Sequence, residues 1–408
     1  MRILHTSDLH VGRTLNNISF LEDQKVVLGQ IADIARAENV DVVVLAGDLY
    51  DRAVPSAEAV NLVDDFLVRL VVHDKRKVLA IAGNHDSPER IGFTNRIQRE
   101  LGLHLRGTLT DLSPVILHDE HGPVAFHLLP YAEVAMARQH ANGGGEDPEA
   151  GDVTDQESDA DTIAVGDSIR SHQAAMAHLV QASLAAGPKI PRRVVVAHAF
   201  VSGGTVSDSE RDLSVGGASQ VAASTFDDFN YVALGHLHRA QQIGETDRVR
   251  YSGSPLKYSI SEADHVKSVA IVDLDGAGEV SVRTIPVVAP RDVRVISGLI
   301  DDLLKSGEGD PHAHDLVGVR LTDAIPPLDP AARLRRWYPN LISVEMARRG
   351  GDGDVPDPDD ETPDPNRTPL DLFSDFFRDM IGTDLDGEER EIVVTAITAA
   401  TSRHEEAH

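Results

Sequence analysis

Hydrophobic positions in the first 285 residues follow two alternating patterns. Short runs rich in Val, Leu and Ala are typical of strands buried on both faces of a sheet. They cover residues 2–6, 41–46, 77–82, 193–198 and 231–235. Residues 22–38, 57–72 and 167–186 instead carry apolar side chains at helical spacing. The alternation of buried strands with helices predicts an α/β fold.

Shorter strands separated by turns complete this first domain, which we expect to span residues 1–285. The pattern predicts them at residues 115–117, 124–129, 249–252 and 268–273. A second domain is predicted over residues 286–348. It has a strand near Val293, followed by helix, strand, helix and strand at residues 299–305, 316–322, 330–337 and 341–346. That order predicts a small α+β unit.

A helical tail is predicted over residues 368–404, after an acidic, proline-rich linker over residues 349–367. Thr before Pro369 is a favourable helix start, because proline suits the first helical position. Apolar side chains then recur at i, i+3, i+4 and i+7, namely Phe373, Phe376, Phe377 and Met380. A last helix is predicted over residues 387–399. We expect this apolar stripe to be buried, either against the α+β unit of the same chain or against a partner protein.

Composition narrows the chemistry that the chain can perform. Its 408 residues suit two or three domains. The chain has no Cys, so any metal must be held by His, Asp, Glu or Asn. No apolar run approaches the roughly 18 residues of a membrane span, and polar residues begin too early for a signal peptide. We therefore expect a cytoplasmic protein.

The charge is strongly acidic, with a formal net value of −28. Much of it lies in two stretches without basic residues, 146–161 with eight acids and 352–364 with seven. The first belongs to an insertion in the first domain, at about residues 141–165. Both stretches are typical of solvated loops. Because most nucleic-acid-binding proteins are basic, DNA would have to be bound through metal ions, local basic residues or a partner.

Polar side chains that suit metal binding follow five of the predicted strands. They are Asp8 and His10, Asp48, Asn84 and His85, His198, and His236 and His238. A single polar residue after a strand more often belongs to a turn or caps a helix. The carboxyl ends of strands in an α/β sheet collect at one edge, however, and five recurrences predict a shared site. A carboxylate there, such as Asp48, can bridge two divalent cations.

These motifs, D-x-H, G-D, G-N-H-D, H and G-H-x-H, resemble the calcineurin-like metallophosphoesterase superfamily. Within it, the stretches at residues 1–12, 47–51, 83–87 and 251–255 are similar to the SbcD family of bacterial nucleases. The similarity is close over residues 1–285 and rests on layout beyond them. It implies a sandwich of two mixed sheets flanked by helices. It also implies that the α+β unit is a cap domain for DNA and that the tail binds an ATPase partner.

The resemblance also implies a division of ligands between two divalent ions, which we expect to be manganese. Asp48 bridges them. Asp8, His10 and His238 hold one ion, and Asn84, His198 and His236 hold the other. The implied activity is manganese-dependent hydrolysis of DNA, as a 3'-5' exonuclease on duplex ends and an endonuclease on single strands or hairpins. The implied partners are DNA, an SbcC-type coiled-coil ATPase and a second copy of the chain in a heterotetramer, in DNA repair and recombination.

His85 follows the ligand Asn84 and is not needed as a ligand, so it is free to act as a general acid. The resemblance implies the same role. Asp51 lies three residues after the bridging position and can orient His85, although it also suits a plain helix start. Four residues on loops past the ligand strands are candidate DNA contacts, namely Arg13, Asn16, Arg52 and Arg90. The chain lacks a P-loop motif, so we expect any ATP to be bound by another subunit.

Two other functions remain open from the sequence. One is a small-molecule phosphatase or cyclic-nucleotide phosphodiesterase of the same superfamily, although such enzymes need little beyond the metal domain. The other is a scaffold with structural metals and no catalytic activity, which a complete ligand set with His85 disfavours.

Overall fold

The computed structural model describes residues 1–143, 165–210, 220–347, 368–381, 383–387 and 389–395. The chain divides into two compact units, Met1–Glu345 and Met346–His408. Residues 144–164 of the predicted insertion at about 141–165 lie outside the described residues, and so does the whole predicted linker at 349–367.

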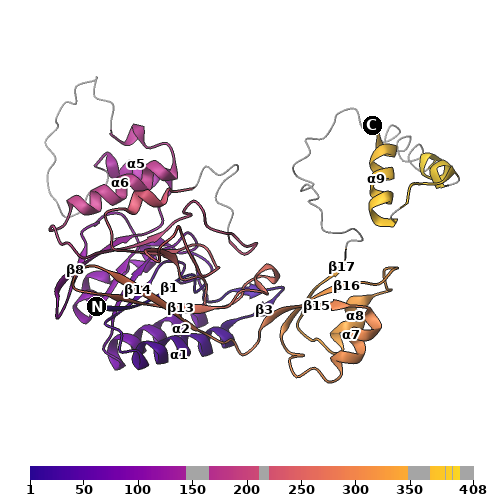
Figure 1. The fold of residues 1–408 in the computed structure, drawn as a ribbon, viewed down its shortest axis with the longest axis horizontal. Helices are drawn as coiled ribbons and strands as arrows, with labels where there is room; N and C mark the ends of the chain where they lie inside the picture. The colour runs from indigo at the N-terminus through magenta and orange to yellow at the C-terminus, as the bar shows by residue number, and fades with distance from the viewer. Residues whose placement is uncertain (144–164, 211–219, 348–367, 382, 388, 396–408) are drawn as a thin grey trace. The chain divides into compact units, whose positions relative to one another are not determined.

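The first unit contains two six-stranded mixed sheets (Figure 1). The first sheet has the order β14 (Val280–Pro286), β13 (Ser268–Leu274), β1 (Arg2–Thr6), β4 (Val42–Leu45), β5 (Lys77–Ile81) and β6 (Leu103–Arg106). The second has the order β11 (Gln241–Gln242), β12 (Val249–Tyr251), β10 (Tyr231–Gly235), β9 (Arg193–His198), β8 (Gly122–Leu129) and β7 (Val115–Asp119). In both sheets the central strands are parallel, for example β1 with β4 and β9 with β10.

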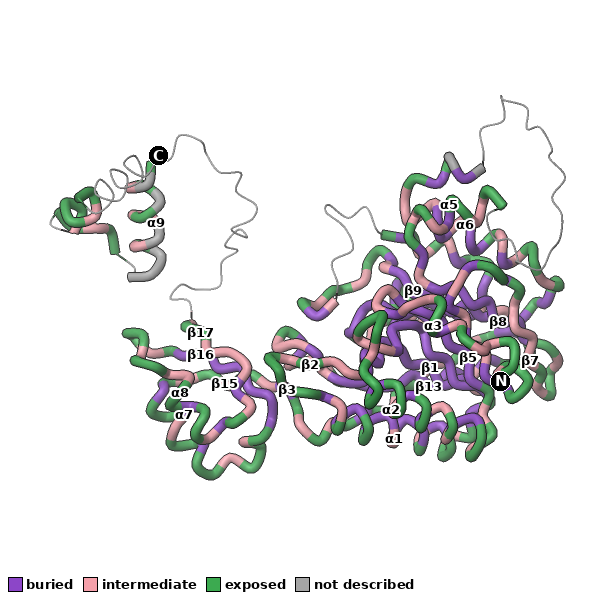
Figure 2. The backbone as a smooth tube through the Cα atoms, turned by 180° about the vertical axis from the view of Figure 1, so that it is seen from behind, coloured by how far each residue is buried: buried purple, intermediate pink, exposed green. Residues whose placement is uncertain are grey.

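Alternate side chains of each central strand enter different cores. Val42 and Val44 of β4 pack between the two sheets. Val43 and Leu45 pack with side chains of α1 (Leu21–Ala37) and α2 (Ala57–Val68). This two-residue period explains why the sequence reads as continuously apolar. Figure 2 shows the sheet strands as the most buried part of the unit.

The second sheet is covered by helices in the same way, on the side away from the first sheet (Figure 1). Val195 and Ala197 of β9 share a core with Met176 and Leu179 of α6 (His172–Ala185). Helix α5 (Val134–Ala141) lies beside α6. The layers are therefore helix, sheet, sheet, helix, which confirms the predicted fold class.

Several boundaries differ from the sequence prediction for local reasons. α6 begins at His172 rather than residue 167, because the Ser171 hydroxyl accepts a hydrogen bond from the Ala174 N–H and caps the helix there. α2 is followed by a π-helical turn, Arg69–His73. The sequence analysis did not predict α5, β6 or β14. The remaining short elements are β2 (Thr14–Leu15), β3 (Ile18–Ser19), α3 (Pro88–Ile91), α4 (Asn95–Gln98), and single turns at Arg99–Leu101, Val165–Ser168, Ala223–Phe226 and Ile260–Glu262.

A small α+β region ends the first unit. Its three-stranded sheet has the order β15 (Val293–Gly298), β16 (Leu316–Leu321) and β17 (Leu341–Met346). Helices α7 (Ile300–Gly307) and α8 (Pro330–Arg335) share a core with this sheet. Asn16 donates from Nδ2 to the carbonyl of Ile342 at 2.7 Å, which ties this region to the loop after β1.

The second unit contains α9 (Pro369–Ile381). Its start is fixed by reciprocal hydrogen bonds. The Thr368 hydroxyl accepts from the Asp371 N–H, and the Asp371 carboxylate accepts from the Thr368 N–H. The rings of Phe373 and Phe377 stack with centroids 6.5 Å apart. The side chains of Phe376 and Met380 lie outside the described set. Residues 389–395 are helical too. No described helix has the length and apolar character needed to cross a membrane.

Candidate metal centre

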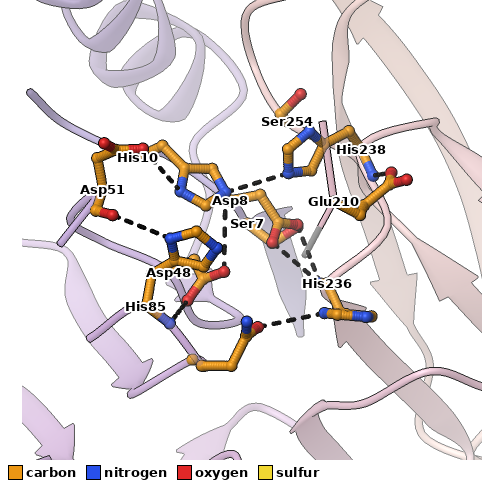
Figure 3. Close-up of polar contacts among 12 residues, drawn as sticks. Ser7, Asp8, His10, Asp48, Asp51, His85, Glu210, His236, His238 and Ser254 are labelled. Atoms are coloured by element: carbon orange, nitrogen blue, oxygen red, sulfur yellow. Dashed lines mark hydrogen bonds and ion pairs between the residues drawn. The ribbon is translucent and has the colours of Figure 1, made fainter. Parts of the chain in front are cut away.

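The predicted strand-end residues come together where the two sheets meet. In the first sheet, the loop after β1 carries Asp8 and His10, the loop after β4 carries Asp48, and the loop after β5 carries Asn84. β9 and β10 of the second sheet end at His198 and at His236 and His238. Figure 3 shows the polar groups of both sheets turned toward one another. All of these side chains are buried except Asn84, which is partly buried.

The carboxylates sit on a constrained backbone. Asp8 and Asp48 have φ of 53° and 52°, and His10 has φ of 43°. Non-glycine residues rarely adopt this left-handed conformation, and such strain is often found at functional sites. The loops are cross-tied, because the Asp8 N–H donates to the Gly47 carbonyl at 3.0 Å and the His10 N–H donates to the Asp48 carbonyl at 3.0 Å. These hydrogen bonds hold the two loops in register and support the strained backbone.

Asp86 joins the loop after β4 to the loop after β5. Its buried carboxylate accepts hydrogen bonds from the N–H groups of Leu49, Tyr50 and Gly83 at 3.1, 3.0 and 2.9 Å. Asp86 belongs to the G-N-H-D motif, so the sequence contained a signal for it. Its contacts place Asp48 and Asn84 relative to each other.

A neighbouring main-chain carbonyl determines the tautomer of His198. Its Nδ1 lies 2.9 Å from the carbonyl of Ala46, which can only accept, so Nδ1 carries the proton. Nε2, the nitrogen left to bind a metal, points into the site, 2.9 Å from Oδ1 of Asn84 and 3.4 Å from Oδ2 of Asp48. Nδ1 of His236 lies 3.2 Å from the same Asn84 oxygen. These atoms form one group of inward-facing ligands.

A second group forms around His10 and His238. Their Nε2 atoms lie 3.1 Å apart, and Nε2 of His10 is 3.7 Å from Oδ2 of Asp48. Asp8, His10 and His238 offer ligand atoms within 4.8 Å of one another, and so do Asp8, Asp48 and His198. One oxygen of Asp48 thus faces both groups, as a bridging carboxylate must.

The residues present fit divalent cations. Lone pairs of buried nitrogen and oxygen atoms converge on one another, which costs free energy unless a cation lies between them. The donor set combines carboxylates, an amide oxygen and imidazoles and contains no thiolate, which suits borderline and hard divalent ions. The site can therefore hold divalent metal.

Electrostatics favour positive charge at this position. Burial by itself would raise the pKa of Asp48, but His198 and His10 hold that pKa well below its usual range. Burial would lower the pKa of His198, yet the Asp48 carboxylate raises it to about 9. Burial lowers the pKa of His236 to about 3 and raises that of Asp8 to about 6. The negative charge of Asp48 is thus balanced either by a proton on His198 or by a metal ion. Because a metal binds only the unprotonated imidazole, the proton and the metal compete at His198.

His85 lies at the partly exposed edge of the site, with its ring 4.6 Å from that of His10 in an edge-on arrangement. Its main-chain N–H donates to Oδ1 of Asp48 at 2.8 Å. Its Nδ1 lies 2.9 Å from the main-chain carbonyl of Asp51. The contact expected between Asp51 and His85 is therefore made by the backbone, while the Asp51 carboxylate lies 3.3 Å from Nη1 of Arg13.

The four candidate DNA contacts occupy different environments. Arg13 is engaged by Asp51, donates to the Ser209 carbonyl at 3.1 Å and lies over the Tyr258 ring. The Asn16 amide is bonded to Ile342. Arg52 and Arg90 are exposed, with Arg52 3.6 Å from the Asp51 carboxylate. Arg52 and Arg90 are therefore more accessible to a substrate than Arg13 and Asn16. All four DNA contacts remain predictions.

Sequence reasoning missed a set of buried residues behind the ligands. Gln24 donates to the carbonyls of Leu9 and His10 and supports the first ligand loop. The hydroxyls of Ser7 and Ser252 lie 2.9 Å apart. Ser209, Glu262 and Lys267 lie behind His238. Ser7 and Ser252 fall in stretches that resemble the SbcD family, but the sequence assigned them no role. Gln24, Ser209, Glu262 and Lys267 have no such signal, because they approach the site only through the tertiary fold.

The chain is similar in sequence to known proteins over most of its length. Residues 1–240, more than half of the chain, match the calcineurin-like phosphoesterase family. Residues 289–380 match a family described as the type 5 capsule protein repressor C-terminal domain, with the short name SbcD_C. The chain is 29% identical over 344 residues to the SbcD subunit of the nuclease SbcCD of Staphylococcus epidermidis, with 84% of this chain and 85% of that protein covered.

Solved structures with a similar arrangement have low sequence identity. A dimetal phosphatase from Danio rerio is 16% identical, with 70% of this chain and 98% of that chain covered and a TM-score of 0.39. A hypothetical protein from Thermus thermophilus is 13% identical, with 71% of this chain and 100% of that chain covered and a TM-score of 0.36.

Proposed function

The chain belongs to the calcineurin-like phosphoesterase family, and from that premise we propose that it is the manganese-dependent nuclease subunit of an SbcCD-type complex. Its resemblance to the SbcD family is confirmed by the two family matches and the staphylococcal relative. The observation that carries the proposal is the convergence of Asp8, Asp48 and the histidines of both sheets on one buried site. The reaction is hydrolysis of a phosphodiester bond.

Two bound cations would supply an activated water and neutralise the charge that develops on the phosphate. Asp48 would bridge them, with Asp8, His10 and His238 on one side and Asn84, His198 and His236 on the other. The protein itself must provide a proton for the leaving oxygen. His85 suits this role because its ring is partly exposed beside the ligands. The Asp51 carbonyl orients the ring through Nδ1, which leaves Nε2 for the substrate.

Manganese is the proposed metal because the site offers only nitrogen and oxygen ligands, with several oxygens and no thiolate. The proposed substrate is DNA, cleaved from 3' ends of duplexes and within single strands or hairpins. The relative covers the α+β region as well as the metal domain, and a phosphatase of small molecules has no need of that region. This favours the α+β region over residues 286–348 as a cap for DNA, in a protein acting in DNA repair and recombination in the cytoplasm.

Purified protein should be assayed with manganese, magnesium and zinc on linear duplex, hairpin DNA, the diester bis-p-nitrophenyl phosphate and the monoester p-nitrophenyl phosphate. We expect manganese to support the highest rate and both DNA substrates to be cleaved. Activity on p-nitrophenyl phosphate, a monoester, without activity on DNA would instead identify a phosphatase. Magnesium and zinc each exceeding manganese across a concentration series would contradict the proposed metal.

The tail is the proposed docking element for the coiled-coil ATPase. Phe373 of α9 is 38% exposed, which leaves apolar surface for a partner helix. A second copy of the chain is proposed to complete a heterotetramer. Phe93, Ile97 and Leu101 of the first unit are 72%, 71% and 66% exposed, and exposed apolar side chains of this size suit such a contact.

Deleting residues 366–408 should abolish co-purification with the ATPase and ATP-dependent processing of duplex ends. Metal-dependent cleavage of single-stranded DNA should persist, because the first unit has its own core. A matched control replaces Val72, 44% exposed on the first unit, with Ser in the full chain, because this residue lies outside the tail. Full-stoichiometry binding of the truncated protein would show that the partner docks elsewhere.

A further inference from the structure

Two buried ionic residues lie behind the site and are not used by the proposed chemistry. Glu262 is 0% and Lys267 is 7% exposed. Glu262 ends the turn Ile260–Glu262, and Lys267 directly precedes β13. Burial of two charges is costly even when they pair. A pair at this place therefore calls for a reason beyond general stability.

Lys267 connects the pair to the backbone of a candidate ligand. Its Nζ donates to the carbonyl of His238 at 2.9 Å and to the hydroxyl of Ser254 at 2.8 Å. It also forms the ion pair with Oε2 of Glu262. The ammonium group thus has three acceptors, which together use all of its protons. One of them fixes the position of the His238 main chain.

Glu262 connects the pair to the ring of the same ligand. Its Oε1 accepts a hydrogen bond from the Ser209 hydroxyl and lies 3.3 Å from Nδ1 of His238. The Ser209 oxygen is 2.6 Å from that Nδ1. Because the hydroxyl has one proton and gives it to the carboxylate, its oxygen accepts from the imidazole. Nδ1 of His238 is then the protonated nitrogen, and the lone pair of Nε2 faces His10.

We propose that Glu262 and Lys267 are positioning residues that set the ring tautomer and main chain of His238 for the ion shared with Asp8 and His10. This inference rests on the proposed function. The two proposed metal positions then differ in how their histidine ligands are oriented. His198, at the other position, is oriented by a single backbone carbonyl, that of Ala46, whereas His238 is held by a buried ion pair and a hydroxyl. Partners that orient a ligand in this way typically change metal affinity 10–100-fold.

A purely structural role for the pair must be separated from positioning. Glu262→Gln alone leaves Lys267 buried without a counter-charge, which destabilises a fold regardless of any metal. The double variant Glu262→Gln/Lys267→Met removes both charges. Ser209→Ala removes only the hydroxyl between the ring and the carboxylate. A matched control is Asp119→Asn, which breaks the partly buried pair with Arg192 at the opposite end of the second sheet.

The test is manganese titration of the full-length protein by calorimetry, with the spin-coupled dimanganese signal followed by electron paramagnetic resonance. Ser209→Ala and the double variant should bind one of the two ions roughly 10–100-fold more weakly and lose the coupled signal at limiting manganese. Their melting temperatures without metal should stay near that of the wild type. Asp119→Asn should melt at a lower temperature and bind manganese normally.

Wild-type affinity for both ions in Ser209→Ala and in the double variant would overturn the inference. So would a loss of affinity in Asp119→Asn that matches its loss of stability, because affinity would then follow folding alone. If the wild type itself bound no manganese, the proposed function would fail first. If the wild type bound two ions and cleaved DNA while the variants matched it, only the positioning role would fail.

Discussion

The two sheets have the same number of strands but contribute different chemistry to the site. The first sheet supplies the acids and the amide, Asp8, Asp48 and Asn84, together with His10. The second supplies imidazoles alone, His198, His236 and His238. Neither set would hold two hard or borderline divalent ions well by itself. The site therefore depends on how the sheets pack, and the core between them, which includes Val44 and Val196, is part of the active centre.

The sheets also differ in how they hold their ligands. The acids stand on left-handed backbone conformations with loops tied to each other. The two imidazoles whose tautomers can be assigned, His198 and His238, are fixed by acceptors behind their rings. Removing a shared acid should thus affect both ions, whereas changes on the imidazole side should affect one.

The largest effect is expected for Asp48→Ala. Turnover should be abolished and the metal content should fall from two ions towards none, because one carboxylate oxygen faces both ligand groups. Metal analysis of purified protein is the measurement, with Asp65→Ala, an exposed acid of α2, as the control. Retention of two ions by the variant would rule out the bridging role.

His85→Gln should have the next largest effect. DNA cleavage should slow by roughly 10²–10⁴, the usual contribution of a general acid, while both ions remain bound. Single-turnover rates and metal content should be measured together, with the exposed His118→Gln as control. Parallel loss of metal and activity would make His85 a ligand instead.

The carboxylate ligands of the first sheet also predict that metal binding depends on pH. Burial raises the pKa of Asp8 to about 6 in the metal-free protein. Asp8 must lose its proton to bind a cation, so below that pH protons compete with metal. The His198 imidazole, whose pKa the Asp48 carboxylate raises to about 9, must lose a proton as well. Manganese affinity should therefore fall by up to about tenfold for each pH unit below about 9, and more steeply below about 6, where Asp8 also binds a proton. Calorimetric titrations between about pH 8 and pH 5 would measure this, and a constant affinity would contradict it.

The smallest of the predicted effects is on stability, at the ion pair of Asp119 and Arg192 far from the metal ligands. Hydrogen bonds from Arg192 hold the pKa of Asp119 below its usual range. A lowered folded-state pKa contributes stability above the unfolded value of about 3.9 and loses it as the pH falls. Asp119→Asn should therefore lower the melting temperature by a few degrees at neutral pH, and the difference should shrink in acid. A difference that stays constant down to low pH would argue against the ion pair.

The predictable part of the fold was the part with strong local periodicity. The run Val42–Leu45 identified a buried strand because both of its faces enter cores. Strand β14 was missed because it is an edge strand with several exposed residues, and its alternation ends at Arg283. Its position is set by pairing with β13.

The same limit applies to the site. Asp48 follows a glycine after an apolar run, so its place at a strand end was visible in the sequence. Glu262 and Ser209 are 53 residues apart and meet only in the folded chain, and no spacing rule predicts such a contact. The backbone contact of Asp51 with His85 was likewise hidden, because a sequence suggests a role for the carboxylate and not for the carbonyl.

The central claim is that ligands from both sheets hold two ions that hydrolyse DNA. Its most direct test is the manganese content of the purified wild-type protein, measured with the rate of hairpin cleavage as manganese is added back after chelation. The account predicts that cleavage rises with the occupancy of the second ion and is complete at two ions per chain. Full activity with one ion bound, or two ions bound without cleavage, would contradict it.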